Sequence, residues 1–181
     1  GTQIFLRDTQ GNTTILVSRD ASGDAGNGAS SQPTISADGR YVAFTSSATT
    51  LAPTPNGSGT QIFLRDTQGN TTILVSQDAV GDAGNGASSQ PTISADGRYV
   101  AVTSVAALAP TPGGSGTQIF RRDTQANATI LVSQDAVGNA GNGVSSAASI
   151  NSNGGLVAFS SAADFALGAT GPVDIYIRAL P

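Results

Sequence analysis

The chain has 181 residues, a formal net charge of −4 and charged side chains at only 11% of its positions, and it contains no Cys, His, Met or Trp. Disulfides and thiolate nucleophiles are therefore excluded, and the commonest general base and zinc ligand is missing. The chain has no basic cluster to attract nucleic acid or an anionic membrane surface, and no apolar run as long as a membrane span.

One sequence occurs three times along the chain. GTQIFLRDTQGNTTILVS begins at Gly1 and at Gly59, and an altered copy begins at Gly116, which gives offsets of 58 (59 − 1) and 57 (116 − 59) residues. A period of this length is typical of stacked supersecondary units that cannot bury their apolar faces alone. We therefore expect a single repeat domain over residues 1–181, with copies at 1–58, 59–115 and 116–181 and incomplete units at both ends.

The first copy contains short β-prone segments and no segment with a helical period. Between these segments, residues 8–12 are typical of a hairpin loop and residues 20–32 of a long polar loop. Asp38-Gly39 predicts a tight turn, because Gly adopts positive φ at little cost. The predicted strands are residues 3–7, 13–18, 33–36 and 41–46, with Pro33 opening the third.

The predicted fold class is all-β, with β-propeller blades of four antiparallel strands. Apolar runs such as Ile73-Leu74-Val75 suit sheets that are covered on both faces. Four strands in a period of this length describe a propeller blade. A β-solenoid has much shorter coils, and a sandwich gives no reason for a periodic sequence.

A family resemblance supports this prediction. Residues 33–46, PTISADGRYVAFTS, resemble the Pro…Ser-x-Asp-Gly-Arg-x-x-Ala-Phe-x-Ser signature of TolB-like β-propellers, whose repeats are also called WD40-like or PD40. Residues 91–104 repeat this signature with Val102 in place of Phe44, and the segments at 3–8, 61–66 and 174–178 resemble the strand that follows it in the family. The third copy departs from the signature, as a terminal unit would, at Ala148, Asn153 and Leu156.

The blade order that the resemblance implies assigns a position to every strand. Residues 33–36 form the innermost strand A and residues 41–46 strand B, while the Ile-Phe-Leu-Arg segment is strand C and the Thr-Ile-Leu-Val segment is the outermost strand D. The chain then has thirteen strands in the order C-D, A-B-C-D, A-B-C-D, A-B-C. This makes about three blades per chain, fewer than the four to eight of most propellers.

The two terminal blades are therefore expected to have open edges that another chain completes. Unpaired strand edges attract other strands, and a head-to-tail contact forms a ring where its rotation closes and a filament where it does not. The alternative is that the chain is a piece of a longer propeller. The residues expected at the closing edges are Ile4, Phe5, Leu6, Ile15, Leu16, Val17, Ile175, Tyr176 and Ile177.

The polar residues predict no catalytic, cofactor or metal site. Asp8, Asp66 and Asp123 follow an Arg in each copy, which suggests a structural hydrogen bond or ion pair. The loop at 78–86 has oxygen ligands of the kind that calcium prefers, but its spacing fails the EF-hand pattern, so a glycine-rich surface loop is favoured. Serine is abundant, but the chain has no His or Lys to activate it.

The sequence thus predicts a non-catalytic binding or assembly module, not an enzyme. Its main expected partner is another copy of itself, and the composition suits an extracellular, cell-surface or periplasmic protein of a bacterium. Two alternatives remain: a multivalent propeller that binds a glycan or a protein, and a propeller fragment of a larger hydrolase or TolB-like protein.

Overall fold

The computed structural model describes residues 1–54, 56–111, 114–165 and 173–180, and all regular elements in these ranges are strands. They form four antiparallel sheets, in the orders β1-β2, β3-β4-β5-β6, β7-β8-β9-β10 and β11-β12-β13. Their bounds are β1 Phe5–Asp8, β2 Thr13–Leu16, β3 Ser30–Ile35, β4 Tyr41–Ser46, β5 Gln61–Asp66, β6 Thr71–Leu74, β7 Ser88–Ile93, β8 Tyr99–Ser104, β9 Gln118–Asp123, β10 Ala128–Leu131, β11 Ser145–Ile150, β12 Leu156–Ser161 and β13 Asp174–Ala179.

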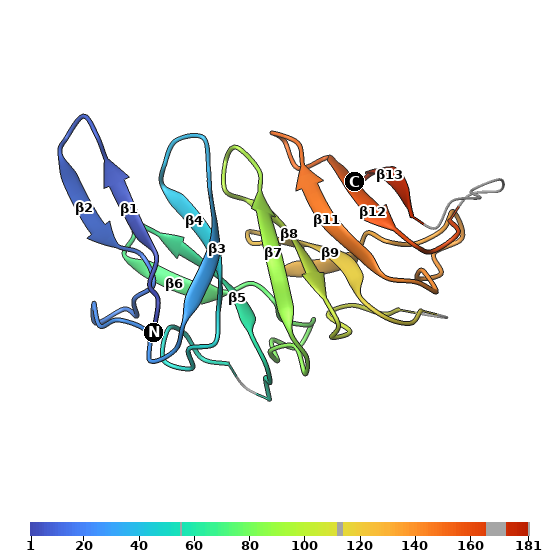
Figure 1. Cartoon of the computed structure of the whole chain (residues 1–181), viewed down its shortest axis with the longest axis horizontal. Coiled ribbons are helices and arrows are strands. Elements are labelled where there is room, and N and C mark those ends of the chain that lie inside the picture. The colour runs from blue at the N-terminus through green and yellow to red at the C-terminus, as the bar shows by residue number, and fades with distance from the viewer. Residues whose placement is uncertain (55, 112–113, 166–172, 181) are drawn as a thin grey trace.

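The four sheets stand side by side in an open row (Figure 1). The two-stranded sheet β1-β2 lies at one end of the row and the three-stranded sheet β11-β12-β13 at the other. The two four-stranded sheets between them are called the interior blades below. The expected thirteen strands and their C-D, A-B-C-D, A-B-C-D, A-B-C order are confirmed.

Each interior blade is apolar on both faces because a sheet covers each of them. Val42, Phe44 and Phe63 pack toward the first sheet, in a cluster with Ile4 and Val17. The residues that alternate with them in β4 and β5 pack toward the following blade, in a second cluster: Ala43, Ile62 and Leu64. This alternation is the two-residue period of a strand, applied to a sheet without a solvent face.

The innermost strands differ from their prediction. β3 begins at Ser30, three residues before Pro33, and its pairing with β4 shifts register between Ser31 and Thr34. The cause is a bulge at Gln32, which has a φ of 53° and whose Oε1 accepts a hydrogen bond of 2.9 Å from Thr45 Oγ1. The predicted polar loop therefore ends earlier than expected, because its last residues enter the sheet.

The turns agree better with their prediction. Gly39 in the Asp-Gly turn has a φ of 74°, and the first hairpin turn ends at Asn12 with a φ of 53°. Asn is one of the few residues other than Gly that adopt this conformation readily. Across the described ranges we find no helix with the length and apolar character required to cross a membrane.

Candidate assembly interface

The interior blades share a buried arrangement that we call the arginine node. It consists of a C-strand Arg, the Asn and Thr of the neighbouring D-strand hairpin, and backbone carbonyls from the blade before. Arg65 Nη1 donates to Thr72 Oγ1 at 3.0 Å and to Asp20 O at 3.3 Å, and its Nη2 donates to Asn70 Oδ1. Charge-assisted bonds of this kind are stronger than neutral ones, so the node ties two strands and two blades together.

The second interior blade repeats the node. Arg122 donates to Thr129 Oγ1 at 2.9 Å and to Asn127, and Thr129 Oγ1 in turn donates to Gln77 O at 2.9 Å. Burial lowers the pKa of both Arg65 and Arg122, but a guanidinium stays charged in a protein. The repetition indicates that the node is part of how one blade attaches to the next.

The two ends of the row each hold half of this node. At the first sheet, Arg7 donates to Thr14 Oγ1 at 3.0 Å and to Asn12, on an exposed surface with no blade in front of it. At the last sheet, Arg178 Nη1 donates to Gln134 O at 2.8 Å and to Asp135 O at 3.1 Å. The last sheet has no D strand in the described part of the chain, so it lacks the Asn and Thr that the first sheet presents.

A second contact between blades, of a tyrosine ring with a glycine of the next blade, also has one half without a partner at each end of the series of blades. Tyr41 lies so close to Gly97 that a Cβ there would be 2.2 Å from the ring, and Tyr99 lies equally close to Gly154. At the first A–B turn, a Cβ at Gly39 would meet nothing within 4 Å. At the last blade, Leu156 stands where the tyrosines stand in the interior blades and is 43% exposed.

Backbone hydrogen bonds between the A–B turns form a ladder along the row. Ala37 N donates to Ala95 O at 2.9 Å, and Ala95 N donates to Ser152 O at 2.9 Å. This leaves Ser152 N on the last blade and Ala37 O on the first interior blade as the two ends of the ladder.

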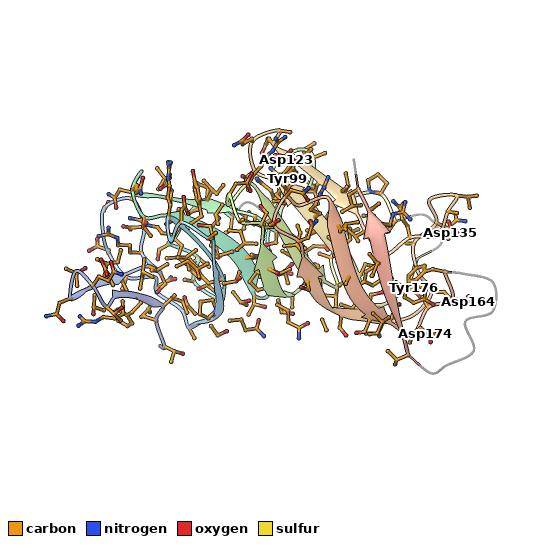
Figure 2. The ribbon with its side chains drawn as sticks, turned by 90° about the horizontal axis from the view of Figure 1, so that it is seen from above. Tyr99, Asp123, Asp135, Asp164, Asp174 and Tyr176 are labelled. Carbon is orange, nitrogen blue, oxygen red and sulfur yellow. The ribbon has the colours of Figure 1, made fainter. Side chains whose placement is uncertain are left out.

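The apolar side chains at the ends show the same pattern. Phe5 is 62% exposed, although Phe63 and Phe120 at the equivalent positions of the interior blades are fully buried. At the other end, Ile175 is 74% exposed and Ile177 is 72% exposed. Figure 2 shows Asp174 and Tyr176 in β13 at the end of the row away from β1, whereas Tyr99 and Asp123, paired across β8 and β9, belong to an interior blade.

The nine residues expected at the closing edges thus fall into two groups. Ile4 and Val17 lie in the core beside the first interior blade, at 6% and 0% exposure. The others lie at the open ends. Leu6, Leu16 and Tyr176 are half-buried there, and Phe5, Ile15, Ile175 and Ile177 are exposed.

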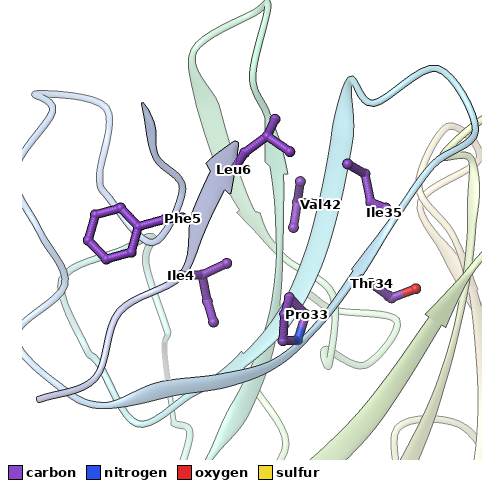
Figure 3. A pocket seen from close by; sticks show the side chains of 7 residues that line it. All are labelled: Ile4, Phe5, Leu6, Pro33, Thr34, Ile35 and Val42. Atoms are coloured by element: carbon purple, nitrogen blue, oxygen red, sulfur yellow. The ribbon is translucent and has the colours of Figure 1, made fainter. Parts of the chain in front are cut away.

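A pocket opens between β1 and the first interior blade (Figure 3). Ile35 in this pocket is 47% exposed, whereas its equivalent Ile93 is 9% exposed. The difference arises because the first sheet has no A and B strands to cover β3. The lining is almost entirely apolar: Ile4, Phe5, Leu6, Pro33, Thr34, Ile35 and Val42.

Two of the three predicted Asp positions form ion pairs, and they do so with other partners than expected. Asp66 pairs with Arg40 at 2.6 Å and Asp123 with Arg98 at 2.6 Å, not with the Arg beside each in the sequence. The register of β4 on β5 places Tyr41 opposite Asp66 and so brings the A–B turn to the end of the C strand. The hydrogen bond from Arg40 lowers the pKa of Asp66 to about 2, and Arg98 does the same for Asp123.

The loop considered for calcium uses its oxygens internally. Asp78 Oδ1 accepts hydrogen bonds from Val80 N at 2.9 Å and Asp82 N at 3.0 Å, and Asn56 Nδ2 donates to Asp82 Oδ2 at 2.9 Å. This is the turn that Asp forms with its own backbone. No group of three or more acidic side chains converges in the part of the chain that the structure describes.

Comparison with known proteins establishes the fold. No protein-family model and no curated protein matches the chain. A prolyl endopeptidase structure is 12% identical, with a TM-score of 0.57, over 98% of this chain and 24% of that one. The fold is that of a β-propeller.

Two further propeller-containing structures are similar. An oligogalacturonate lyase from Vibrio parahaemolyticus is 14% identical, with a TM-score of 0.55, over 99% of this chain and 42% of that one. A putative TolB from Agrobacterium tumefaciens is 17% identical, with a TM-score of 0.49, over 99% of this chain and 50% of that one. This propeller chain spans half or less of the length of each of these three proteins.

Proposed function

We propose that this propeller is a non-catalytic assembly module whose copies join head to tail through their end sheets. The observation that carries the proposal is the split arginine node. Arg178 with its carbonyl partners lies at one end, and Asn12 and Thr14 lie at the other. One junction between two copies would complete the node, as it is completed twice within each copy.

In the proposed assembly each junction forms one complete blade. The last sheet supplies strands A, B and C, and the first sheet of the next copy supplies strand D. Each copy then accounts for three blades, so two copies would supply six (2 × 3), within the usual range for a closed propeller. A rotation per copy that does not close would give a filament instead.

The composition supports a non-catalytic role. The chain has no His, Cys or Lys, so its serines lack the bases that most often activate a serine nucleophile. The low charge and the richness in Ser, Thr, Gly, Ala and Asn also suit the proposed extracellular or periplasmic setting.

A second candidate is a propeller section within a larger protein. It is favoured by the comparisons, because the chain matches 24% of the endopeptidase and 42% of the lyase. In that case neighbouring blades of the same polypeptide would cover the end sheets. Glycan binding has less support, because all three tyrosines are half-buried and so offer little free ring surface for a sugar.

Light scattering coupled to size exclusion, followed by electron microscopy, tests the proposal. We expect particles larger than one chain, seen as rings or filaments, and we expect Arg178→Gln to reduce them. Monomers in both preparations would contradict self-assembly and leave the section of a larger protein as the better account.

A further inference from the structure

We propose that assembly is a strand exchange, in which β13 of one copy takes the place of β1 in the next copy. This inference rests on the proposed self-assembly and names the segments that carry it. The free chain holds β1 in that place, so β1 acts as a removable cover of the site that receives the second copy.

β13 and β1 are equivalent strands. The pairing of Phe159 with Tyr176 corresponds to that of Phe44 with Phe63, which identifies β13 as a C strand like β5. Repeat spacing makes β1 the C strand of the first sheet, with Phe5 equivalent to Phe63. The matched pairs of β13 and β1 are therefore Ile175 with Ile4, Tyr176 with Phe5, Ile177 with Leu6 and Arg178 with Arg7.

Along its own span β1 pairs over four residues with β2 alone, and three of its four side chains are exposed. The residue before it, Ile4, is packed in the core and bonded to Val17 and Ser18, so the exchange requires Ile175 to take the place of Ile4 there. β13, by contrast, pairs over six residues with β12, and the ring of Tyr176 lies 5.8 Å from that of Phe159 and 4.9 Å from that of Phe165. The strand with fewer partners is the one that can leave at lower cost.

The ion-pair positions also indicate that β13, and not β1, is the C strand that remains paired with β12. In the interior blades, an Arg in the A–B turn pairs with the Asp that ends the C strand. In the last blade both partners are replaced together, by Gly155 and Ala179. If β1 instead replaced β13, Asp8 would lie beside Gly155 without an arginine, so β13 is the strand that suits β12.

The interior blades fix the register of the new pairing. β5 pairs with β6 through Phe63 to Leu74 and Leu64 to Ile73. Transferred to the junction, this places Tyr176 opposite Leu16, Ile177 opposite Ile15, and Arg178 opposite Thr14 of the next copy. Arg178 then reaches Asn12 and Thr14, which Arg7 has released, and the node is complete.

The exchange also covers the exposed surfaces described above. Ile175 and Ile177 would be buried as Ile62 and Leu64 are, at 0% and 4% exposure. The accompanying strands β11 and β12 supply the A and B strands that the pocket lacks, with Leu156 over Gly39 and Ser152 N within reach of Ala37 O. The first sheet consists only of strands C and D, so it provides neither the contact over Gly39 nor the hydrogen bond to Ala37 O.

A disulfide that fixes β1 to β2 tests the exchange. The chain has no cysteine, so Phe5→Cys with Leu16→Cys, which stand opposite each other, introduces the only possible pair. We expect the oxidised protein to stay monomeric and the reduced protein to assemble. Equal assembly of both forms would overturn the exchange but not self-assembly, whereas a monomeric wild type at every concentration would overturn both.

A mixed cross-link checks the register independently of that variant. Ile177→Cys and Ile15→Cys proteins, prepared separately and mixed, should form a mixed disulfide dimer on oxidation. Ile175→Cys is the matched control, since it lies two residues away on the same exposed face of β13 and should react with Ile15→Cys at least tenfold more slowly. A faster reaction at Ile175 would overturn the proposed register.

Discussion

Tyr41 covers Gly97 so closely that no larger residue fits at that glycine. A Cβ there would lie 2.2 Å from the tyrosine ring, and Gly97 also has a φ of 76°. Tyr99 and Gly154 repeat the contact between the next two sheets. The contact therefore defines how one blade follows another, and its unused halves, Leu156 and Gly39, are the positions that the proposed assembly would bring together.

Replacing Leu156 by Tyr should strengthen assembly. The ring would restore the interior contact over Gly39 of the next copy and bury more apolar surface, which we expect to tighten association by about fivefold, or about 1 kcal/mol. Sedimentation velocity over a concentration series measures this change. Leu156→Asp is the matched control and should weaken association. An unchanged mass distribution for both variants would argue against contact at this position.

Arg178 and Arg7 should have opposite effects on assembly. Arg178→Gln removes the charged donor from the completed node, and bonds to charged groups contribute about 1.5–3 kcal/mol, so association should weaken by roughly 10- to 100-fold. Arg7→Gln loosens β1 from Asn12 and Thr14 and should favour assembly. The two variants are compared by light scattering at equal concentration. Weaker assembly in both would indicate that β1 stays in place.

Asp174→Gln is expected to improve the junction. The equivalent residues are Gln in the other three C strands, and Gln61 Nε2 and Gln118 Nε2 donate to Gly84 O and Gly141 O, each at 2.8 Å. Asp cannot donate such a bond when ionised. Isothermal dilution of the assembled protein should show slower dissociation for Asp174→Gln than for wild type. Faster dissociation would mean that this side chain does not enter the equivalent site.

Phe63 and Phe5 offer a test of the fold by matched truncation. Both occupy the same position of the repeat, but Phe63 is fully buried and Phe5 is 62% exposed. Phe63→Ala should lower the free energy of unfolding by about 3–5 kcal/mol, and Phe5→Ala by less than about 0.5 kcal/mol in the unassembled chain. Urea denaturation measures both. Similar losses would show that the first sheet is covered in the free chain.

Acid should weaken the interior blades through Asp66 and Asp123. Their pKa values are lowered from 3.8 to about 2 by hydrogen bonds from Arg40 and Arg98. A lowered folded-state pKa means that the stabilisation is fully present above about pH 4 and is lost as the pH falls toward 2. The Asp66→Asn variant should show a flatter dependence of the melting temperature on pH in that window.

Asp8→Asn is the control for the acid measurement. Asp8 occupies the equivalent position in β1, and no ion pair with arginine involves it within the described residues. Because Asp8 lacks that ion pair, its replacement should change the melting temperature in this pH window less than Asp66→Asn does. An effect as large as that of Asp66→Asn would show that the ion pairs do not control acid stability.

The strand order could be predicted from sequence because the repeat is nearly unbroken. Gly39 and the hairpin ending at Asn12 also behave as their residue types predict. The bulge at Gln32 could not be predicted, since Gln has no preference for positive φ and Pro33 is a typical first residue of a strand. Tertiary pairing with β4 and the next innermost strand decides that conformation.

The hydrogen bonds between neighbouring blades could not be predicted from the sequence. Nothing local links Arg65 to the carbonyls of residues 19 and 20, because the contact depends on how two sheets stack. A signal was nonetheless present. Arg7, Asn12 and Thr14 recur at the same spacing in two further copies, and Gly155 and Ala179 replace both members of an ion pair at once. Coordinated changes of this kind indicate that the two positions contact each other.

Sedimentation equilibrium of the wild-type chain, from submicromolar to submillimolar concentration, tests most directly whether the two end sheets complete one another. We predict an average mass that rises with concentration above the 17.9 kDa of one chain and falls again for Arg178→Gln. A mass of one chain at every concentration would contradict the account.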